Sequence, residues 1–277
     1  MNETAKVMQH YGRNDLRERL DEALRAAGLA DRRLSPADLA PLDQFHTRGL
    51  AATVELAEAA GVERGAAVID IGSGLGGPSR YLAATFDCQV HGIDLSPPFV
   101  AAATYLAQRA GLGGKVTYEC ADALALPYEK GRFDLAWTQH VAMNIADRAP
   151  LYAEVHRVLR PGGRLAIYDV VAGTGGPLHF PVPWSREPES SFLVTPASMR
   201  ATLEQQGFRV VGWTDQTETG IAWFEQQQKA RAQAPASPSL LGLHLAMGPE
   251  FPAMAANLGR NLREGRAGLI QAVLERP

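Results

Sequence analysis

Short, mainly apolar segments alternate along the chain with longer segments in which apolar residues recur at helical spacing. Continuous apolarity over the length of a strand is typical of strands buried on both faces of a parallel sheet. Apolar residues three and four positions apart indicate amphipathic helices that pack on such a sheet. The alternation therefore predicts an α/β fold with helices on both faces. We expect strands at residues 67–71, 89–93, 116–120, 133–138, 164–171, 208–214 and 267–274, and sheet-packing helices at 78–86, 99–110, 150–159 and 195–206.

The residues before the first expected strand are predicted to form a helical N-terminal cap, residues 1–61. Apolar residues recur at helical spacing from Leu16 to Ala27, and a second amphipathic stretch covers residues 50–59. Packing against one side of the sheet accounts for such a cap, and closing over a bound ligand is the alternative. Residues 62–277 form the predicted main domain.

Two later segments interrupt the alternation and are predicted to be lid insertions in the main domain. Residues 172–195 are rich in glycine and proline, and residues 215–265 contain helical patterns at 222–233 and 252–263. Between those helices, the proline- and serine-rich stretch 234–239 predicts an exposed linker. A cap and two lids beside a sheet suit a roofed cavity, which favours a small substrate over a polymer.

Composition and charge narrow the functional classes. The 277 residues are 46% hydrophobic, enough for a sizeable core, and the net charge of −3 gives no electrostatic argument for nucleic acid or anionic membrane. No apolar run reaches membrane-spanning length, and the polar N-terminus is unlike a signal peptide. Cys88 and Cys120 have no ligand-spaced His/Cys cluster and are interpreted as reduced thiols. We therefore expect a cytoplasmic protein without nucleic-acid, membrane or metal partners.

Glycines follow the first expected strand at the point where the chain must turn into a helix. Gly72, Gly74 and Gly77 satisfy G-x-G-x-x-G, so a dinucleotide-dependent oxidoreductase has to be considered. Acidic residues at the carboxyl ends of three successive strands favour a different cofactor. These residues are Asp70, Asp94 and Asp122.

Five motifs occur in an order and spacing that resemble those of class I S-adenosylmethionine-dependent methyltransferases, small-molecule branch. They are Asp70-x-Gly72-x-Gly74-x-Gly76, Asp94, Asp122-Ala123, Phe133-Asp134-Leu135 and Leu159-Arg160-Pro161-Gly162-Gly163. The resemblance spans roughly residues 62–172. It implies a Rossmann-like sheet of seven strands, mostly parallel with an antiparallel last strand, and S-adenosyl-L-methionine as cofactor.

The resemblance also implies roles for the residues around the cofactor. Asp94 would accept hydrogen bonds from the ribose hydroxyls and Asp122 from the adenine amine, with Leu95 and Ala123 packing against the base. The methionine portion would be surrounded by Asp70, Gly72, Ser73, Gly74 and Gly76. Tyr11 resembles an N-terminal tyrosine that covers the methionine end of the cofactor, although simple packing of the terminus is an alternative.

Two histidines are candidates for catalysis. Gln139 and His140 directly follow the fourth strand, where they would contact cofactor and substrate, and His140 is the better candidate for a general base because imidazole titrates near neutrality. His46 is the second candidate. Each histidine has a simpler interpretation as a hydrogen-bonding or packing residue, and N- or C-methylation requires no dedicated base.

The lids carry aromatic and apolar residues that are candidates to bind a substrate, namely Trp184, Phe192 and Met247, although each also suits ordinary packing. Taken together, we expect methyl transfer to a nitrogen, oxygen or carbon atom of a small molecule. The alternative is a non-catalytic protein that binds S-adenosylmethionine or S-adenosylhomocysteine. The sequence leaves the oligomeric state open, with a homodimer among the alternatives.

Overall fold

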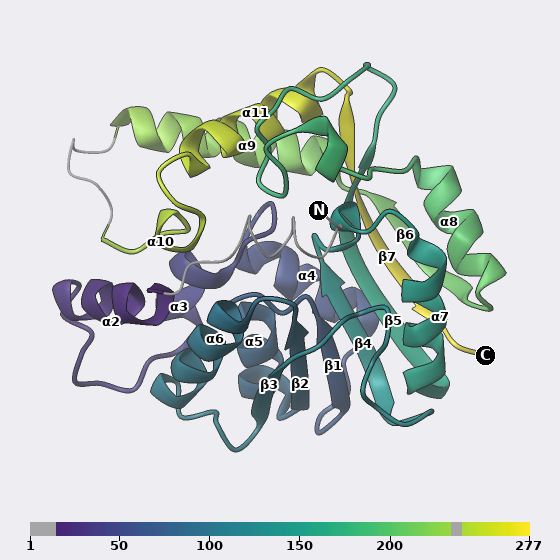
Figure 1. Cartoon of the computed structure of the whole chain (residues 1–277), viewed down its shortest axis with the longest axis horizontal. Helices are drawn as coiled ribbons and strands as arrows, with labels where there is room; N and C mark the ends of the chain where they lie inside the picture. The colour runs from purple at the N-terminus through teal and green to yellow at the C-terminus, as the bar shows by residue number, and fades with distance from the viewer. Residues whose placement is uncertain (1–14, 234–239) are drawn as a thin grey trace.

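The computed structural model describes residues 15–233 and 240–277. A seven-stranded sheet with the order β3-β2-β1-β4-β5-β7-β6 forms its centre (Figure 1). Only β7 runs antiparallel to its neighbours β5 and β6 within this sheet. The strands are β1 Ala67–Ile71, β2 Gln89–Asp94, β3 Val116–Cys120, β4 Phe133–Gln139, β5 Leu159–Ala172, β6 Arg209–Asp215 and β7 Ala267–Glu275. The predicted fold class is confirmed.

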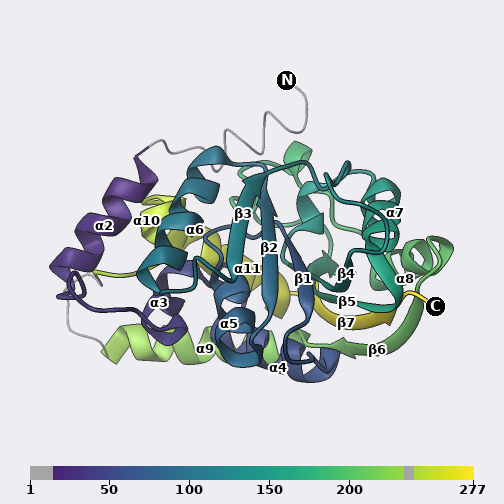
Figure 2. The same cartoon turned by 90° about the horizontal axis from the view of Figure 1, so that it is seen from below.

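Helices cover both faces of the sheet, as Figures 1 and 2 show. On one face lie α4 Leu50–Ala60, α5 Gly77–Phe86 and α6 Pro97–Arg109; on the other lie α7 Arg148–Val158 and α8 Pro196–Gln205. Alternate strand residues point to opposite faces, so Val68 packs in the core on the α5 side and Ile69 in the core on the α7 side. Both residues are fully buried, which explains the continuous apolarity of β1.

The N-terminal cap belongs to the core on the α5 face. It contains α2 Leu16–Ala26 and α3 Pro36–Asp43, and the three leucines that α2 presents at helical spacing have no exposed surface. A buried ion pair joins the cap to the sheet helices, because Arg80 at the start of α5 donates to Asp43 at 2.5 Å. Removing one partner of such a pair would leave a buried charge uncompensated. The cap is therefore a packed layer of the molecule.

The two lid insertions meet above the carboxyl ends of the strands and form a roof (Figure 1). Its helices are α9 Thr217–Gln233, α10 His244–Met247 and α11 Phe251–Arg263, and a short 3-10 helix, Pro188–Ser190, lies in the first insertion. Asn261 of α11 is fully buried and clamps the backbone of His179 in the first insertion. Its Oδ1 accepts from the His179 N–H at 2.8 Å and its Nδ2 donates to the His179 carbonyl at 3.0 Å. Two insertions far apart in sequence thus form one structure.

Two expected boundaries were wrong. β5 begins at Leu159, five residues earlier than expected, because Leu159 pairs with Phe133 and the N–H of Gly162 donates to the Arg276 carbonyl at 2.7 Å. These long-range partners keep extended a segment that the sequence assigns to a turn. Helix α9 begins at Thr217 rather than near Ala222, because the Asp215 carboxylate accepts the Thr217 N–H at 2.8 Å.

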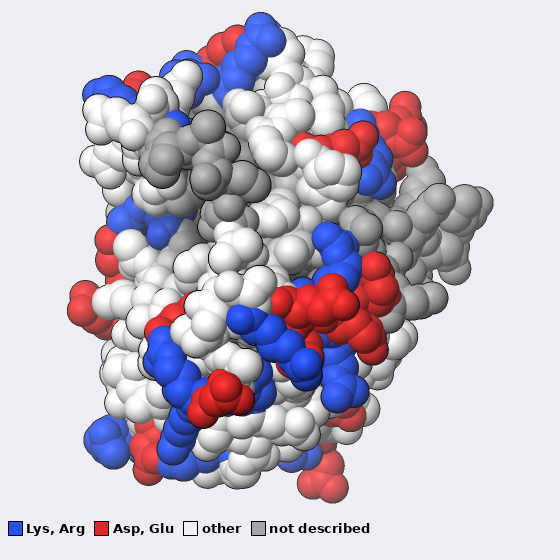
Figure 3. Space-filling model, turned by 90° about the vertical axis from the view of Figure 1, so that its left-hand side faces the viewer, with Lys and Arg blue, Asp and Glu red and all other residues white. Residues whose placement is uncertain are grey.

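Charged side chains of both signs are interspersed on the α2 side of the molecule (Figure 3). Ion pairs in the N-terminal cap include Arg25–Asp21 at 2.9 Å and Arg32–Asp38 at 2.6 Å. In residues 15–233 and 240–277, no helix has both the length and the apolarity to cross a bilayer.

Replacing Asn261 with alanine is expected to loosen the roof. The substitution leaves the His179 N–H and carbonyl without their buried partner, which costs about 2 kcal/mol, and the melting temperature should fall by about 5 °C. Differential scanning calorimetry measures the change. Arg260→Ala, one position along the same helix and exposed, is the matched control and should change the melting temperature by less than about 2 °C. Equal effects of the two substitutions would contradict the clamp.

Candidate functional site

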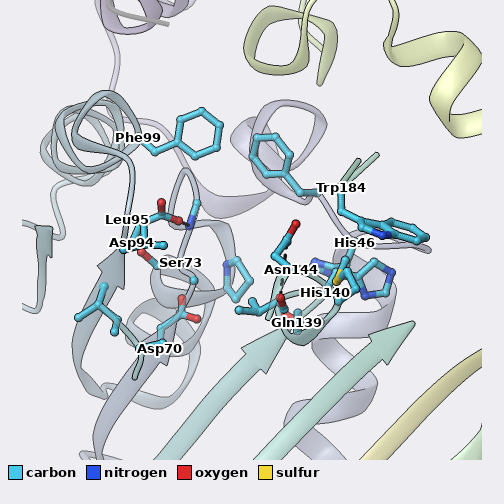
Figure 4. Close-up of a pocket in the computed structure, with 18 of the residues that line it drawn as sticks. His46, Asp70, Ser73, Asp94, Leu95, Phe99, Gln139, His140, Asn144 and Trp184 are labelled. Carbon is cyan, nitrogen blue, oxygen red and sulfur yellow. Dashed lines mark hydrogen bonds between the residues drawn. The ribbon is translucent and has the colours of Figure 1, made fainter. Parts of the chain in front are cut away.

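A cavity lies where the carboxyl ends of β1, β2 and β4 meet the cap and the roof (Figure 4). Its empty volume is about 1390 Å³, which includes open solvent at its mouth. In Figure 4, Asp70, Ser73 and Asp94 lie at the left end, and His46, Asn144 and Trp184 at the right end. Ligands of open α/β sheets bind at this edge, beyond the carboxyl ends of the strands.

The loop between β1 and α5 requires glycine at two positions of the cavity wall. Gly72 and Gly74 have φ angles of +67° and +54°, in the left-handed region that side chains disfavour. A Cβ on Gly72 would lie 2.5 Å from Val141 Cγ2. The backbone therefore forms this part of the wall and lies open to a ligand.

Gly77, the last glycine of the dinucleotide-like pattern, makes room for the cap. A Cβ there would lie 2.6 Å from both the backbone oxygen and the Oδ1 of Asp43. The glycine lets the end of α3 approach the start of α5, where Asp43 pairs with Arg80. Packing of the cap thus explains this glycine without a bound dinucleotide.

Asp94 ends β2 and organises the glycine loop. Its Oδ2 accepts the Gly74 N–H at 3.0 Å and its Oδ1 accepts the Ser96 N–H at 2.9 Å. Burial raises the pKa of this carboxyl, and the backbone hydrogen bonds oppose the shift. Each carboxylate oxygen retains capacity for a further hydrogen bond. Asp94 can therefore hold the loop and still accept from ribose hydroxyls.

Asp70, at the end of β1, is a buried carboxyl that faces a cavity. It is 2% exposed, and its Oδ2 accepts from Ser79 Oγ at 2.5 Å. The pKa of Asp70 is raised to about 7, because burial and the charge of Asp94 outweigh the opposing hydrogen bond from Ser79. The group changes charge near neutrality, so a cation bound beside it would favour its ionised form.

His140 is held in one tautomer by the cap. Its Nε2 accepts the backbone N–H of Thr47 at 3.2 Å, so this nitrogen carries no proton, and Nδ1 lies 3.1 Å from the Tyr168 carbonyl as its donor. The residue has φ +55°, a conformation that is uncommon outside glycine and often found at functional sites. Burial lowers the pKa of His140 to about 4. Its lone pair is engaged with Thr47, which favours a positioning role over proton transfer.

His46 is held in the opposite tautomer. Its Nε2 lies 2.9 Å from the Gly49 carbonyl, which can only accept, so Nε2 carries the proton and Nδ1 keeps its lone pair. Thr53 Oγ1 lies 3.0 Å from the same Nε2. Burial lowers the pKa of His46 to about 3, and the nearby His140 adds to the shift. The loop at residues 44–49, between α3 and α4, therefore binds the lone pair of His140 through Thr47. The lone pair of His46, on Nδ1, has no such contact with this loop.

Polar atoms in the wall remain unsatisfied within the part of the chain that the structure describes. Gln139 Oε1 accepts from Trp137 Nε1 at 2.9 Å, whereas Gln139 Nε2, Asp43 Oδ1 and Ser73 Oγ are buried without a partner. Such atoms are rare in folded proteins and are explained when a polar ligand binds. Together with Asp70 and Asp94, this donor and acceptor set fits an amino-acid and ribose-containing cofactor.

The structure brings most of the predicted site residues into one cavity wall. They are His46, Asp70, Gly72, Ser73, Gly74, Asp94, Leu95, Asp122, Ala123, Gln139, His140, Trp184 and Met247. Tyr11 lies outside the described residues. Within residues 15–233 and 240–277, no group of three or more His, Cys, Asp or Glu residues is placed to hold a metal ion.

Two predicted residues are not among those that line this cavity, and their assignment stays a prediction. Phe192 is fixed by backbone contacts, its N–H donating to the Met143 carbonyl at 2.9 Å and its carbonyl accepting from Arg148 at 3.0 Å. Gly76 packs against Tyr118, whose hydroxyl donates to the Gly76 carbonyl at 3.2 Å.

Sequence reasoning missed Asp43, Phe45, Phe99 and Asn144, which also line the cavity. The rings of Phe45 and Phe99 lie 5.7 Å apart and join the cap to α6. Phe99 could have been predicted, because it lies in the first turn of the helix that follows Asp94 and is therefore close to the same edge of the sheet. Asp43 and Phe45 had no local signal beyond their place at the end of a cap helix.

Residues 69–167 match the family model for a methyltransferase domain. Over 100 residues the chain is 43% identical to the chloroplastic tocopherol O-methyltransferase of Arabidopsis thaliana, covering 36% of this chain and 29% of that protein. Over 163 residues it is 30% identical to dimethylglycine N-methyltransferase of Parasynechococcus marenigrum, covering 59% and 58%. The chain thus spans less than two thirds of either relative.

Among solved structures, the 4+2 cyclase SpnF matches with a TM-score of 0.72 at 24% identity, over 99% of this chain and 97% of that one. This likeness concerns the fold. The sheet order defines a Rossmann-like domain, and the glycine loop and the acidic strand ends fit a nucleoside-containing cofactor. The matched methyltransferase domain and these relatives support a class I S-adenosylmethionine-dependent methyltransferase, with S-adenosylmethionine as the cofactor.

Replacing His140 with asparagine is expected to lower turnover by less than about tenfold, because its lone pair is already bound by Thr47. The shape of the pH–rate profile should not change. The measurement is the rate of S-adenosylhomocysteine formation from pH 6 to 9. Thr47→Val removes one of the two Thr47 contacts and should show a smaller loss. A loss of 10²-fold or more with a missing basic limb would make His140 the base.

Proposed function

We propose that this protein transfers the methyl group of S-adenosylmethionine to a nitrogen, oxygen or carbon atom of a small-molecule acceptor. The observation that carries the proposal is the continuity of one roofed cavity. Its acidic, glycine-lined end suits the cofactor, and its other end, with His46, Trp184 and Met247, offers space for a second molecule.

The cofactor supplies an activated methyl group on a sulfonium sulfur. The residues of the chain bind and orient the reactants, since in-line displacement depends mainly on placing the acceptor atom close to the methyl carbon. Asp94 would fix the ribose, and Asp70 with the glycine-loop backbone would fix the methionine portion. The cap and the roof exclude water from the reacting atoms.

A second candidate function is cofactor binding without methyl transfer. The specific observation is the fold match to SpnF, which is named as a cyclase and not as a methyltransferase. Fold alone therefore does not fix the reaction. Formation of S-adenosylhomocysteine separates the candidates, because only methyl transfer consumes the cofactor.

Isothermal titration calorimetry tests the proposal at the level of binding. We expect S-adenosylhomocysteine to bind with micromolar affinity and NAD and NADP to show no binding at millimolar concentration. Turnover is then measured as S-adenosylhomocysteine released with a panel of acceptors. Preferential binding of NAD would overturn the proposal, and tight cofactor binding without turnover on any acceptor would favour the second candidate.

The cellular compartment and the partners beyond the small molecule stay predictions. We propose a cytoplasmic protein that acts without nucleic acid or membrane. The net charge of −3 supports this, because it provides no general attraction for polyanions. Cell fractionation tests the compartment, and light scattering tests for a homodimer.

A further inference from the structure

The segment that follows β4 supplies a large share of the cavity wall. Six neighbouring residues line the cavity there: Gln139, His140, Val141, Met143, Asn144 and Ile145 (Figure 4). The segment bends sharply, because His140 has φ +55° and Ala142–Asn144 form a short 3-10 helix. A shift of this segment would therefore move several groups of the cavity at once. A misplacement of about 1 Å can cost about 10²-fold in rate, so the contacts that hold the segment matter for transfer.

A buried carboxylate of β5 holds this segment. Asp169 is 1% exposed, and its Oδ2 accepts the N–H of Ala142, the first residue of the 3-10 helix, at 3.2 Å. Its Oδ1 accepts the N–H of Val170 at 3.1 Å, and the N–H of Val141 also favours the ionised carboxyl. An ionised carboxylate only accepts hydrogen bonds, whereas protonation would turn one oxygen into a donor. The charged form of Asp169 is therefore the one that suits these N–H groups.

Arg148, at the start of α7, supplies the counter-charge. It is 4% exposed, and its Nη2 donates to the Phe192 carbonyl at 3.0 Å, while Nε and Nη1 have no partner within the described ranges. Hydrogen bonding alone therefore does not explain why this cation is buried. Its charge offers a reason, because it favours the ionised form of Asp169. Phe192 also binds the segment directly, since its N–H donates to the Met143 carbonyl at 2.9 Å.

We propose that Asp169 is a positioning residue for methyl transfer: its carboxylate, with Arg148 as counter-charge, holds residues 140–145 where they line the cavity. The inference rests on the proposed function, because it concerns the rate of the same reaction. Asp169 is not among the described residues that line the cavity, so it acts on the reactants through the segment that it binds. Groups that are held in place beforehand need no ordering when the reactants bind, and this raises the rate.

The charge of Asp169 depends on its surroundings. Burial raises its pKa to about 6, while Arg148 and the backbone N–H groups oppose the shift. Tyr152, also of α7, stays neutral because burial raises its pKa, and His140 of the segment stays neutral because burial lowers its pKa to about 4. From β7, the uncharged Ile270 lies opposite Asp169. The carboxyl is therefore mainly ionised at pH 7, and removing the charge of Arg148 would raise its pKa further.

Hydrogen exchange measured by mass spectrometry tests the positioning without an acceptor. The full chain and Asp169→Asn are compared at pH 7 with saturating S-adenosylhomocysteine. We expect the amides of residues 141–145 to exchange about tenfold faster in the variant, and those of β1 and α5 to change by less than about twofold. Asp134→Asn is the matched control, because Asp134 accepts a backbone N–H of the same sheet, that of Ala67, at 2.7 Å. It should leave residues 141–145 unchanged. Unchanged exchange of these residues in Asp169→Asn, or equal acceleration throughout the sheet, overturns the proposal.

Arg148→Gln tests the charge separately from the fold. Glutamine keeps an N–H donor for the Phe192 carbonyl but removes the counter-charge, so more of the Asp169 carboxyl is protonated at pH 7. Residues 141–145 should exchange about fivefold faster than in the wild type at pH 7, and less than about twofold faster at pH 9, where the carboxyl ionises again. The ratio for Asp169→Asn should be the same at both pH values. A merely structural role of Arg148 predicts a ratio that does not change with pH, and that result overturns the charge pair.

Turnover connects the segment to the reaction. The acceptor panel includes phenol, benzylamine and indole as probes of transfer to oxygen, nitrogen and carbon. With the probe that gives the highest rate, Asp169→Asn should lower kcat by about 10- to 100-fold and keep the affinity for S-adenosylhomocysteine within about threefold. Asp134→Asn should keep both within about threefold. An unchanged kcat in Asp169→Asn overturns the positioning role, whereas absence of turnover by the wild type on every acceptor is the separate failure of the proposed function.

Discussion

Asp94→Ala is expected to weaken S-adenosylhomocysteine binding by about 100-fold. In the proposed role the carboxylate accepts both ribose hydroxyls, and each hydrogen bond to a charged group is worth about 1.5–3 kcal/mol. It also holds the Gly74 N–H at 3.0 Å, so its removal loosens the glycine loop that forms the cavity wall. Isothermal titration calorimetry at fixed pH and salt measures the loss.

Two variants give this measurement its controls. Asp94→Asn keeps one acceptor oxygen of the same shape and should lose about tenfold, between the wild type and alanine. Asp122→Asn changes an exposed carboxyl of the same wall and should lose less than about tenfold. An Asp94→Ala protein with unchanged melting temperature and unchanged affinity would remove Asp94 from the ribose site.

The sheet was predictable from the sequence because its signal is local and strong. β1 is followed directly by Gly72 and β2 ends at Asp94, and the limits of β1, β2, β3 and β4 differ from the expected ones by at most one residue. The start of β5 was not predictable, because its extended backbone depends on Phe133 and Arg276, distant in sequence. The packed cap is a similar case. A helical pattern shows that Leu16 and Leu20 share a face, and only the fold shows that α6 covers it.

The candidate site also contains residues that local sequence predicts and residues whose roles depend on distant contacts. Aspartates at strand ends were predictable, because parallel strands bring their carboxyl ends to one edge. The roles of the two histidines were not, since each depends on the partner that fixes its tautomer. Thr47 binds Nε2 of His140 across 93 positions of sequence, and the Gly49 carbonyl fixes Nε2–H of His46. Contact between the loop at residues 44–49 and His140 at the end of β4 therefore decides which imidazole has a lone pair without a hydrogen-bond partner from this loop.

Asp70→Asn is expected to stabilise the folded protein at pH 8. The carboxyl ionises near pH 4 in the unfolded chain, whereas burial raises its pKa to about 7 in the folded protein. A group with a raised folded pKa contributes stability below the unfolded pKa and loses it as the pH rises through the folded pKa. Above pH 7 the wild type therefore carries an unfavourable buried charge that asparagine removes. The melting temperature should rise by about 5 °C at pH 8 and by much less at pH 5.

Asp70→Asn should at the same time weaken cofactor binding, and the loss should itself depend on pH. At pH 8 the ionised carboxylate can attract the ammonium group of the cofactor, so the variant should bind S-adenosylmethionine about tenfold more weakly. At pH 6 the wild-type carboxyl is mostly protonated in the free protein and resembles asparagine, so the ratio of affinities should approach two- to threefold. Calorimetry at both pH values measures the ratio, and Asp122→Asn serves as the control for loss of an exposed carboxyl. A ratio that does not change with pH, or a variant less stable than the wild type at pH 8, would show that Asp70 is not the buried, cofactor-facing charge of this site.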